Sequence, residues 1–456
     1  MTRAQETSVA EVLAERVSGL SPAQLPLTLR HAIDNLVLDV VGLCLAARQT
    51  AYVGAALAGA EGDGICTVIG QTRQGSAATA ALINGIAAHG EDFDDTFEGG
   101  PVHAGAVVVP AVLAIAERVR PEGPAALLGI AVGIETICRL SLVAPKRVHD
   151  AGFHPTSVFG AMAAAIAAAA TLGLGARHMV HALGIAGSMA SGIIEYLADG
   201  SSTKRLHAGW AAQAGVQAAL LARAGFTGPR TVFEGRHGLF NAFARDRAGD
   251  YARLTEDFGT RWVAEALAFK PFACGTMIHP YIDCARRISA RGIAAETIAE
   301  ITCEAAEGTV QRLWEPLAQK QAPPNAYAAK FSMPFCIALA FVTGDVGVAA
   351  FSEAAMADPR IRTLAAKIRY VVDRQNPYPA SYTGHVRIVL RDGQVVEERQ
   401  PHFRGGAQQP LSCAEIEEKF FANAAYGGWP RARAEAAHDL SRRLFDGPID
   451  LAFLRG

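Results

Sequence analysis

The first 269 residues of this chain carry apolar side chains mostly at the spacing of α-helices. Apolar residues recur at every third or fourth position, which is the period of one helix face. Stretches with this pattern or with an Ala-rich apolar composition are residues 9–18, 27–47, 104–118, 124–140 and 206–224. Charged residues in the second stretch lie largely off its apolar face. We therefore predict a helical domain over this part of the chain.

The pattern changes near Lys270. Residues 297–306 alternate between apolar and polar side chains, as a half-buried strand does. Residues 385–390 and 394–399 have the composition of strands, and Arg391-Asp392-Gly393 between them predicts a hairpin. From residue 412 the spacing is helical again. These changes predict an α+β domain that interrupts the helical one.

The predicted fold is therefore mainly α. A large all-helical domain is formed by both ends of the chain, residues 1–269 and 405–456. A smaller α+β lid domain, residues 270–404, is inserted between them. At 456 residues the chain is long enough for two such domains.

Composition narrows the classes of function. The formal net charge is −2, so the charge balance supports neither a nucleic-acid partner nor an anionic membrane surface. The eight cysteines are scattered without zinc-site spacing, which predicts reduced thiols and a cytoplasmic protein. The uncharged run at residues 157–174 is rich in Ala and Gly. We therefore expect a buried core helix there and not a membrane span.

Acidic residues gather in one stretch, residues 84–103, with a histidine towards each end. The Ala-rich run before it predicts a helix that continues into the acidic cluster. On such a helix His89, Asp92 and Thr96 share one face, and His103 begins the next helix. The cluster fits either proton-transfer chemistry or an exposed acidic helix end, and this stretch alone leaves both interpretations open.

Five further residues are candidates for chemistry. His154 lies in GFHPT, and Lys204 and His207 lie one turn apart at the start of a predicted helix, where anions are favoured. Lys270 and His279 lie in FKPFACGTMIHP at the expected domain junction, where clefts form. Taken singly, each is more simply a structural histidine or a surface lysine. No nucleotide loop, nucleophile elbow or H-E-x-x-H motif is present, so we predict no cofactor and no metal.

Several stretches together resemble the MmgE/PrpD family. The motifs that carry the resemblance are NGIAAHGEDFDDT (84–96), GFHPTSVFGAMAAA (152–165), GSSTKRLHAGWAAQAGVQAALLARAGFTGP (200–229), FEGRHGLF (233–240), FKPFACGTMIHPYIDCA (269–285) and KFSMPF (330–335). The family includes 2-methylcitrate dehydratase, cis-aconitate decarboxylase and iminodisuccinate epimerase. The resemblance implies a helical domain with an inserted lid, a cofactor-free homodimer, and a site between the two domains.

The resemblance also implies site residues. Catalytic positions of the decarboxylase branch fall on Asp92, Thr96, His103, His154, Lys204 and Lys270. His207 and His279 are then candidates for substrate binding. A further histidine of the decarboxylase branch falls on Gly275, and the dehydratase pattern near it is here Pro271-Phe272-Ala273-Cys274.

These features predict an enzyme that moves a proton next to a carboxylate. We expect a hydro-lyase acting on a small di- or tricarboxylate; the alternatives are a cis-aconitate-type decarboxylase, an epimerase using the same carbanion, and a non-enzymatic helical binding protein. In the enzymatic interpretations His103 and His154 are acid and base, and Asp92 orients one of them. Thr96 donates a hydrogen bond to substrate, and Lys204 and Lys270 hold the developing charge.

Overall fold

The computed structural model describes residues 6–245 and 248–456. Helices make up most of this part of the chain and the sheets are small, so the prediction of a mainly α fold is confirmed. The chain forms two compact units. Unit 1 comprises residues 1–90, 94–267 and 416–456, and unit 2 comprises residues 91–93 and 268–415.

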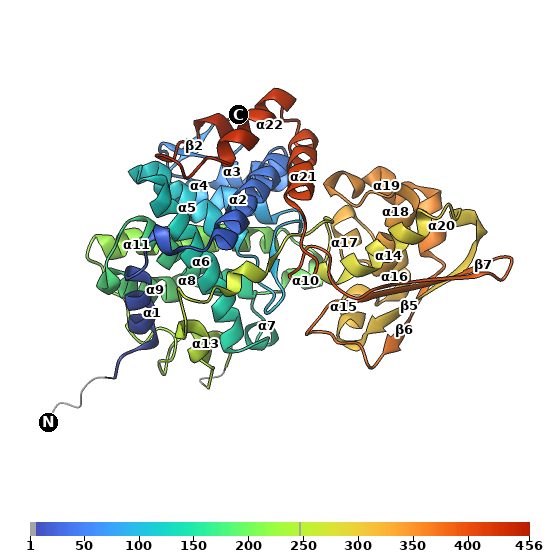
Figure 1. Cartoon of the computed structure of the whole chain (residues 1–456), viewed down its shortest axis with the longest axis horizontal. Helices are drawn as coiled ribbons and strands as arrows, with labels where there is room; N and C mark the ends of the chain where they lie inside the picture. The colour runs from blue at the N-terminus through green and yellow to red at the C-terminus, as the bar shows by residue number, and fades with distance from the viewer. Residues whose placement is uncertain (1–5, 246–247) are drawn as a thin grey trace. The chain divides into compact units, whose positions relative to one another are not determined.

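Unit 1 is helical and takes in both ends of the chain (Figure 1). Its longer helices are α1 Val9–Ser18, α2 Leu27–Ala47, α3 Ala51–Gly59, α4 Ala77–His89, α5 Gly105–Val119, α6 Gly123–Val143, α8 Pro155–Thr171, α9 Ala176–Met189, α11 Thr203–Arg223, most of α21 Cys413–Tyr426, and α22 Arg431–Ser441. Its shorter elements are β1 Cys66–Thr67, β2 Gln74–Gly75, β3 Thr96–Phe97, α7 Arg147–Asp150, α10 Tyr196–Asp199, α12 Leu239–Phe243 and α13 Ala252–Thr255.

The returning C-terminal segment is tied to unit 1 by a buried ion pair. Lys419 on α21 lies with its Nζ 2.8 Å from a carboxylate oxygen of Asp39 on α2. Removing one partner of such a pair leaves the other charge buried, which is costly. This contact therefore helps to hold the two ends of the chain in one unit.

Unit 2 is built on a four-stranded sheet with the order β6-β5-β7-β8. The strands are β5 Ile298–Ala306, β6 Ile368–Asp373, β7 Gly384–Leu390 and β8 Val395–Gln400. β6 is parallel to β5, and β7 is antiparallel to both β5 and β8. The predicted hairpin is therefore confirmed.

Helices complete unit 2. They are α14 His279–Ser289, α15 Val310–Leu313, α16 Leu317–Gln321, α17 Ala326–Ala329, α18 Met333–Thr343, α19 Glu353–Ala357 and α20 Pro359–Ala365; the short strand β4 Leu267–Ala268 lies at the unit boundary. α14 packs against β7 and β8 and contacts α18 on another side. Its buried residues include Ile282, Ala285 and Ile288, which follow the helical period.

One helix of the described part of the chain, α6, is long and apolar enough to cross a membrane, and 94% of its apolar window is buried inside the protein. α2 and α3 meet the same criterion only when they are counted as one span with a bend of 92°. The uncharged run predicted as a core helix forms α8, whose residues are all buried. A core helix meets the length and composition test as readily as a membrane span does.

The expected helix through the acidic cluster is wrong. α4 ends at His89, Gly90 caps it, and Asp92 has a φ of 56° in the left-handed region. Thr96 lies in β3 and not on a helix. Asp is one of the few residues apart from Gly that tolerate left-handed backbone. The chain therefore reverses direction where the sequence pattern predicted a continuous helical face.

Candidate active site

Four histidines from separate segments gather in unit 1. They are His89 at the end of α4, His103 just before α5, His154 at the start of α8, and His207 in the first turns of α11. The ring centroid of His89 lies 4.9 Å from that of His103 and 5.7 Å from that of His154. His154 in turn lies 6.4 Å from His103 and 5.2 Å from His207. We call these four side chains the histidine cluster.

Close helix packing brings the cluster together. A Cβ built on Gly85 of α4 would lie 2.6 Å from the Cα of Gly209, and one built on Gly209 of α11 would lie 2.1 Å from the carbonyl oxygen of Leu82. Only glycine permits so close an approach. Because Gly85 is about one turn before His89 and Gly209 follows His207, this contact brings the parts of α4 and α11 that carry the two histidines close together, and the charge of His89 acts on His207.

Small residues also align α8 with α11. A Cβ on Gly160 would lie 3.1 Å from Ala211, and one on Gly215 would lie 2.3 Å from Ala164. The two contacts are four residues apart on each helix and run in the same direction, so the helices are parallel. Extending this register towards the helix starts places His154 next to the first turns of α11, where His207 lies.

Asp94 and Asp95 serve different partners. Asp94 is buried, and one of its carboxylate oxygens lies 2.7 Å from Nδ1 of His89 and 3.4 Å from Nδ1 of His103. The carboxylate of Asp95 accepts hydrogen bonds from the backbone N–H groups of Ala104 and Gly105 at the start of α5. Burial, followed by the charge of Asp94, raises the pKa of Asp95 to about 8, against the lowering effect of these two hydrogen bonds.

His154 and His207 form a direct contact. Their Nδ1 atoms lie 3.1 Å apart, and both side chains are buried. The ring of Tyr196 on α10 lies 6.4 Å from that of His154 and 5.6 Å from that of His207. The Tyr196 ring therefore packs beside both imidazole rings.

Burial disfavours the protonated, positively charged form of both imidazoles. It lowers the pKa of His154 well below the usual range, and the charges of His89, His207, Lys204 and His103 lower it further. Burial likewise lowers the pKa of His207 to about 4, with added effects of His89 and Lys204. Both rings are neutral at pH 7, so either can exchange a proton without a resident charge.

Lys204 lies in the first turn of α11 and is 5% exposed. Its charge acts on both His154 and His207. Thr96 is also buried in unit 1, and the backbone N–H of His103 donates to Oγ1 of Thr156 at 3.2 Å. Unit 1 thus contains a buried cation beside the neutral pair His154 and His207, an arrangement that suits an anionic substrate.

Unit 2 contains the other predicted residues. Lys270 is buried, and its Nζ donates to the backbone carbonyl of Asp92 at 2.9 Å. Nζ of Lys330 lies 2.5 Å from a carboxylate oxygen of Glu91 and also donates to the Glu91 carbonyl. The segment 91–93 is therefore held by two lysines of unit 2.

The surroundings of His279 favour a structural role. It is fully buried, its Nε2 lies 3.1 Å from the carbonyl oxygen of Cys274, and its ring lies 5.3 Å from the rings of both Phe272 and Phe403. Packing of this kind is typical of a histidine inside a hydrophobic core.

Three members of the site have the composition of a metal centre. One ligand atom from each of His89, Asp94 and His103 lies within 4.8 Å of the others. The Nδ1 atoms of both histidines already face oxygen acceptors, namely Asp94 and, for His103, the backbone carbonyl of Asp95 at 2.6 Å. A metal ion bound here would take the place of the protons in these hydrogen bonds. Histidine and carboxylate are common metal ligands, so the three residues fit a metal ion. The hydrogen bonds that they form fit acid–base chemistry without a metal equally well.

Sequence reasoning selected His103, His154 and His207 but did not choose His89, Asp94 or Tyr196. The carboxylate that contacts the two histidines is Asp94, whereas the sequence had pointed to Asp92. The available signal was Gly90, because glycine commonly ends a helix, and here α4 ends there before the chain turns at Asp92. The prediction of a continuous helix through this stretch placed Asp94 away from His89.

The helical scaffold, the neutral pair His154 and His207 and the buried lysine form an arrangement that suits acid–base chemistry on an anion. Residues 11–251 match the MmgE/PrpD N-terminal domain, and residues 272–443 match the MmgE/PrpD C-terminal domain. The chain therefore belongs to the MmgE/PrpD family, and it is a lyase of that family.

Relatives across the chain agree with this class. Human cis-aconitate decarboxylase is 31% identical over 361 residues, which cover 76% of this chain and 72% of the human protein. The cis-aconitate decarboxylase-like protein oryM of Aspergillus oryzae is 27% identical over 440 residues, covering 91% of this chain and 90% of that protein. The cis-aconitate decarboxylase of Aspergillus terreus is 24% identical over 448 residues.

Proposed function

We propose that the chain is a lyase of a small tricarboxylate, with decarboxylation of a cis-aconitate-like acid as the first reaction to test. The observation that carries the proposal is the buried pair of neutral imidazoles, His154 and His207, beside Lys204. The names of the relatives support the choice of substrate. Dehydration of a related hydroxy acid is the second candidate, because the same proton-transfer groups serve both reactions.

In the decarboxylation, a carbon–carboxylate bond breaks and CO₂ leaves. The electron pair stays on the remaining carbon skeleton as a carbanion stabilised by conjugation. An N–H group of the histidine cluster then donates its proton to that carbon. Lys204 offsets the negative charge of the substrate carboxylates during the step, and a preorganised cation is worth most where water is excluded.

We propose the same catalytic residues as the sequence indicated, extended by the structure, and leave His279 out because it is packed in the core of unit 2. His103 and His154 exchange the proton, Lys204 binds carboxylate, and Thr96 contributes a hydrogen bond. Asp94 orients His89 and His103 through contacts of 2.7 and 3.4 Å. Lys270 and Asp92 join this list as predictions, supported by the burial of Lys270 and its hydrogen bond to the Asp92 carbonyl.

The test is a substrate screen on the purified full chain. Incubation with cis-aconitate should release CO₂ and yield one five-carbon dicarboxylate. ¹³C NMR of the reaction mixture would detect this product. A new enoate absorbance from citrate-like hydroxy acids without CO₂ release would identify a dehydratase. Solvent deuterium uptake into an unchanged dicarboxylate would identify an epimerase. Folded protein that transforms none of these acids would refute the lyase proposal.

We also propose a cofactor-independent homodimer of the cytoplasm with residues 1–269 and 405–456 as one domain and 270–404 as the other. All eight cysteines are free and seven are buried, as expected in a reducing compartment. Light scattering of the purified chain would test the dimer, since a monomeric mass at assay concentration contradicts it. Limited proteolysis should cut first near residues 268 and 415.

A further inference from the structure

The contact between His154 and His207 restricts where their protons lie. A neutral imidazole carries one N–H, and its other nitrogen is an acceptor. Two Nδ1 atoms 3.1 Å apart share one hydrogen bond, so one Nδ1 carries a proton and the other does not. In a neutral pair the two rings must therefore be opposite tautomers. One ring has a bare Nε2, and the other has an Nε2–H.

The other two histidines of the cluster have assigned tautomers. Nδ1 of His103 lies 2.6 Å from the backbone carbonyl of Asp95, and a carbonyl can only accept, so Nδ1 carries the proton. Nδ1 of His89 faces the Asp94 carboxylate at 2.7 Å and likewise donates. In its neutral form each of these two rings then has an Nε2 without a proton, which can accept a proton but cannot give one. In that form neither ring supplies an acid.

We propose that His207 is a positioning residue that donates its Nδ1–H to Nδ1 of His154 and so holds His154 as the Nε2–H tautomer. His154 is then the one ring of the histidine cluster that presents a proton at Nε2. This assigns His154 as the acid. The choice of His207 as the donor rests on the proposed function, because the site needs an acid, whereas the single shared hydrogen bond follows from the Nδ1–Nδ1 distance alone.

The surroundings keep the pair neutral. The groups whose charges act on it are His89, His103 and Lys204, and Tyr196 is the aromatic neighbour. The carboxylate of Asp94 is directed at His89 and His103. A charged imidazole in the pair would face Lys204 in a buried setting, which disfavours it.

The backbone holds the pair in place. The backbone N–H of His154 donates to the carbonyl of Gly192 at 2.8 Å, and Oγ of Ser157 lies 3.4 Å from the carbonyl oxygen of His207. Gly192 has a φ of 113°, and a Cβ there would lie 2.6 Å from Ser157 and 3.5 Å from Cε1 of His207. Glycine at this position lets the loop close against both rings, so the Nδ1–Nδ1 contact is built into the fold.

Neutron diffraction from deuterium-exchanged crystals of the whole protein tests the proton positions without any substrate. We expect deuterium on Nδ1 of His207 and Nε2 of His154. Deuterium on Nδ1 of His154, or on all four nitrogens of the pair, would overturn the inference. Because this result does not depend on turnover, a protein inactive on every carboxylate could still show the predicted tautomers, which separates this inference from the proposed function.

Variants of His207 test the positioning role. Asn places an amide nitrogen the same number of bonds from Cβ as Nδ1, so His207→Asn can still donate to His154. His207→Leu has a similar branched shape and no donor. We expect the Asn variant to keep turnover within roughly tenfold of the parent and the Leu variant to lose roughly 100-fold or more, as loss of a general acid does.

The pH profile separates positioning from loss of structure. The Asn variant should keep the parent profile, and the Leu variant should lose the limb that reports the acid. Equal turnover in the Asn and Leu variants, with both folded, would contradict the proposal. His31→Asn is the matched control, because His31 is exposed on α2 and should leave turnover unchanged.

Discussion

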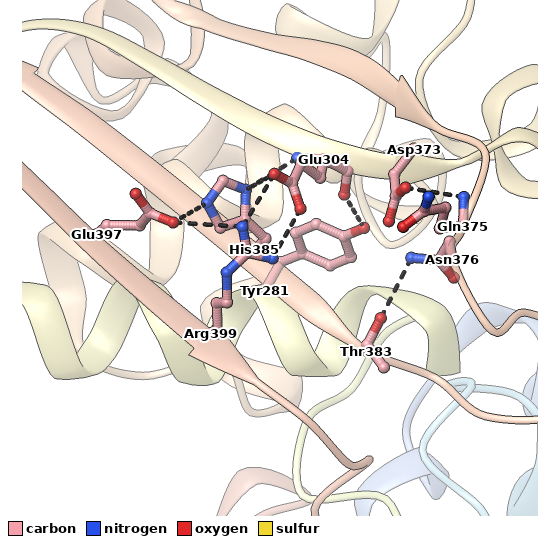
Figure 2. Close-up of polar contacts among 9 residues, drawn as sticks. All are labelled: Tyr281, Glu304, Asp373, Gln375, Asn376, Thr383, His385, Glu397 and Arg399. Atoms are coloured by element: carbon pink, nitrogen blue, oxygen red, sulfur yellow. Dashed lines mark hydrogen bonds and ion pairs between the residues drawn. The ribbon is translucent and has the colours of Figure 1, made fainter.

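His154 in unit 1 and His385 in unit 2 are both 6% exposed, yet their neighbours differ completely. His385 lies on the sheet between two glutamates (Figure 2). Its Nδ1 accepts the backbone N–H of Glu304, and its Nε2 lies 2.9 Å from the carboxylate of Glu397. Arg399 closes the group with a two-pronged contact to Glu304. Both ring nitrogens of His385 are therefore occupied by neighbours within its own sheet.

His154 is surrounded by three other imidazoles, a tyrosine ring and the charge of Lys204. The comparison shows that burial alone does not identify a reactive histidine. His385 has both ring nitrogens engaged by Glu304 and Glu397, which favours a structural role. A histidine among neutral rings beside a cation is left able to exchange a proton with a ligand.

The largest expected difference is in turnover. His154→Ala should lower kcat by roughly 10²–10⁴-fold, because a general acid is removed. His385→Ala should leave kcat within about twofold per folded molecule. Steady-state assays on the substrate found in the screen give both values. Equal losses in the two variants would break the comparison.

The same contrast applies to two buried lysines of unit 1. Lys204→Met should lower kcat/KM by roughly 100-fold or more, or on the order of 3 kcal/mol of transition-state stabilisation. Lys419→Met should instead lower the free energy of unfolding by about 3 kcal/mol, because the buried Asp39 loses its ion pair with Lys419, and should leave the kinetic constants unchanged. Steady-state kinetics and chemical denaturation of both variants distinguish the two roles. If the Lys204 variant lost stability but kept its kcat/KM, Lys204 would not be a site residue.

The free energy of unfolding should decrease as the pH is lowered, because the fold keeps His207 neutral. The pKa of His207 is about 4 in the folded state, below the ordinary value near 6.5, so the unfolded chain binds more protons between these values. The free energy of unfolding is therefore progressively lost as pH falls from about 6.5 to about 4, by at most about 3 kcal/mol for this group.

The raised pKa of Asp95 acts in the opposite direction, since its folded state holds the extra proton between its ordinary pKa and about 8. A comparison of the parent with His207→Asn cancels this effect. Denaturation curves at pH 7 and pH 4.5 should show a smaller loss for the variant. An identical loss would mean that His207 is not held neutral by the fold.

His385 should matter for stability and little for catalysis. His385→Ala removes the acceptor of the Glu304 N–H and the contact to Glu397, which should cost about 1–2 kcal/mol. Thermal unfolding monitored by circular dichroism measures this loss. No change in Tm would show that the contacts of His385 with Glu304 and Glu397 do not contribute to stability.

The smallest expected effect is that of chelation. Although His89, Asp94 and His103 form a possible metal group, their hydrogen bonds suit proton transfer, so turnover should be unchanged after EDTA treatment and dialysis. Elemental analysis of the dialysed protein is the companion measurement. Activity that is lost and then returns with Zn²⁺ would reassign these residues as metal ligands.

The sequence by itself determined the class of fold and several local elements. The apolar period predicted α2 over residues 27–47, and the alternation with Arg391-Asp392-Gly393 predicted the β7–β8 hairpin. The motifs around residues 84–96 and 200–229 carried the resemblance to the MmgE/PrpD family, which the domain matches confirm. These features depend on near neighbours in the chain, so a periodic pattern suffices to predict them.

Only the tertiary structure decided which polar side chains meet. The end of α4 at His89 and the left-handed turn at Asp92 direct Asp94 back to the histidines, where the sequence had favoured Asp92. The contact of Gly85 with Gly209 and the register of α8 with α11 bring His154 to His207 across 53 residues. Helix-to-helix distances of this kind depend on side-chain volumes in two separate segments, and no pattern within either segment specifies them.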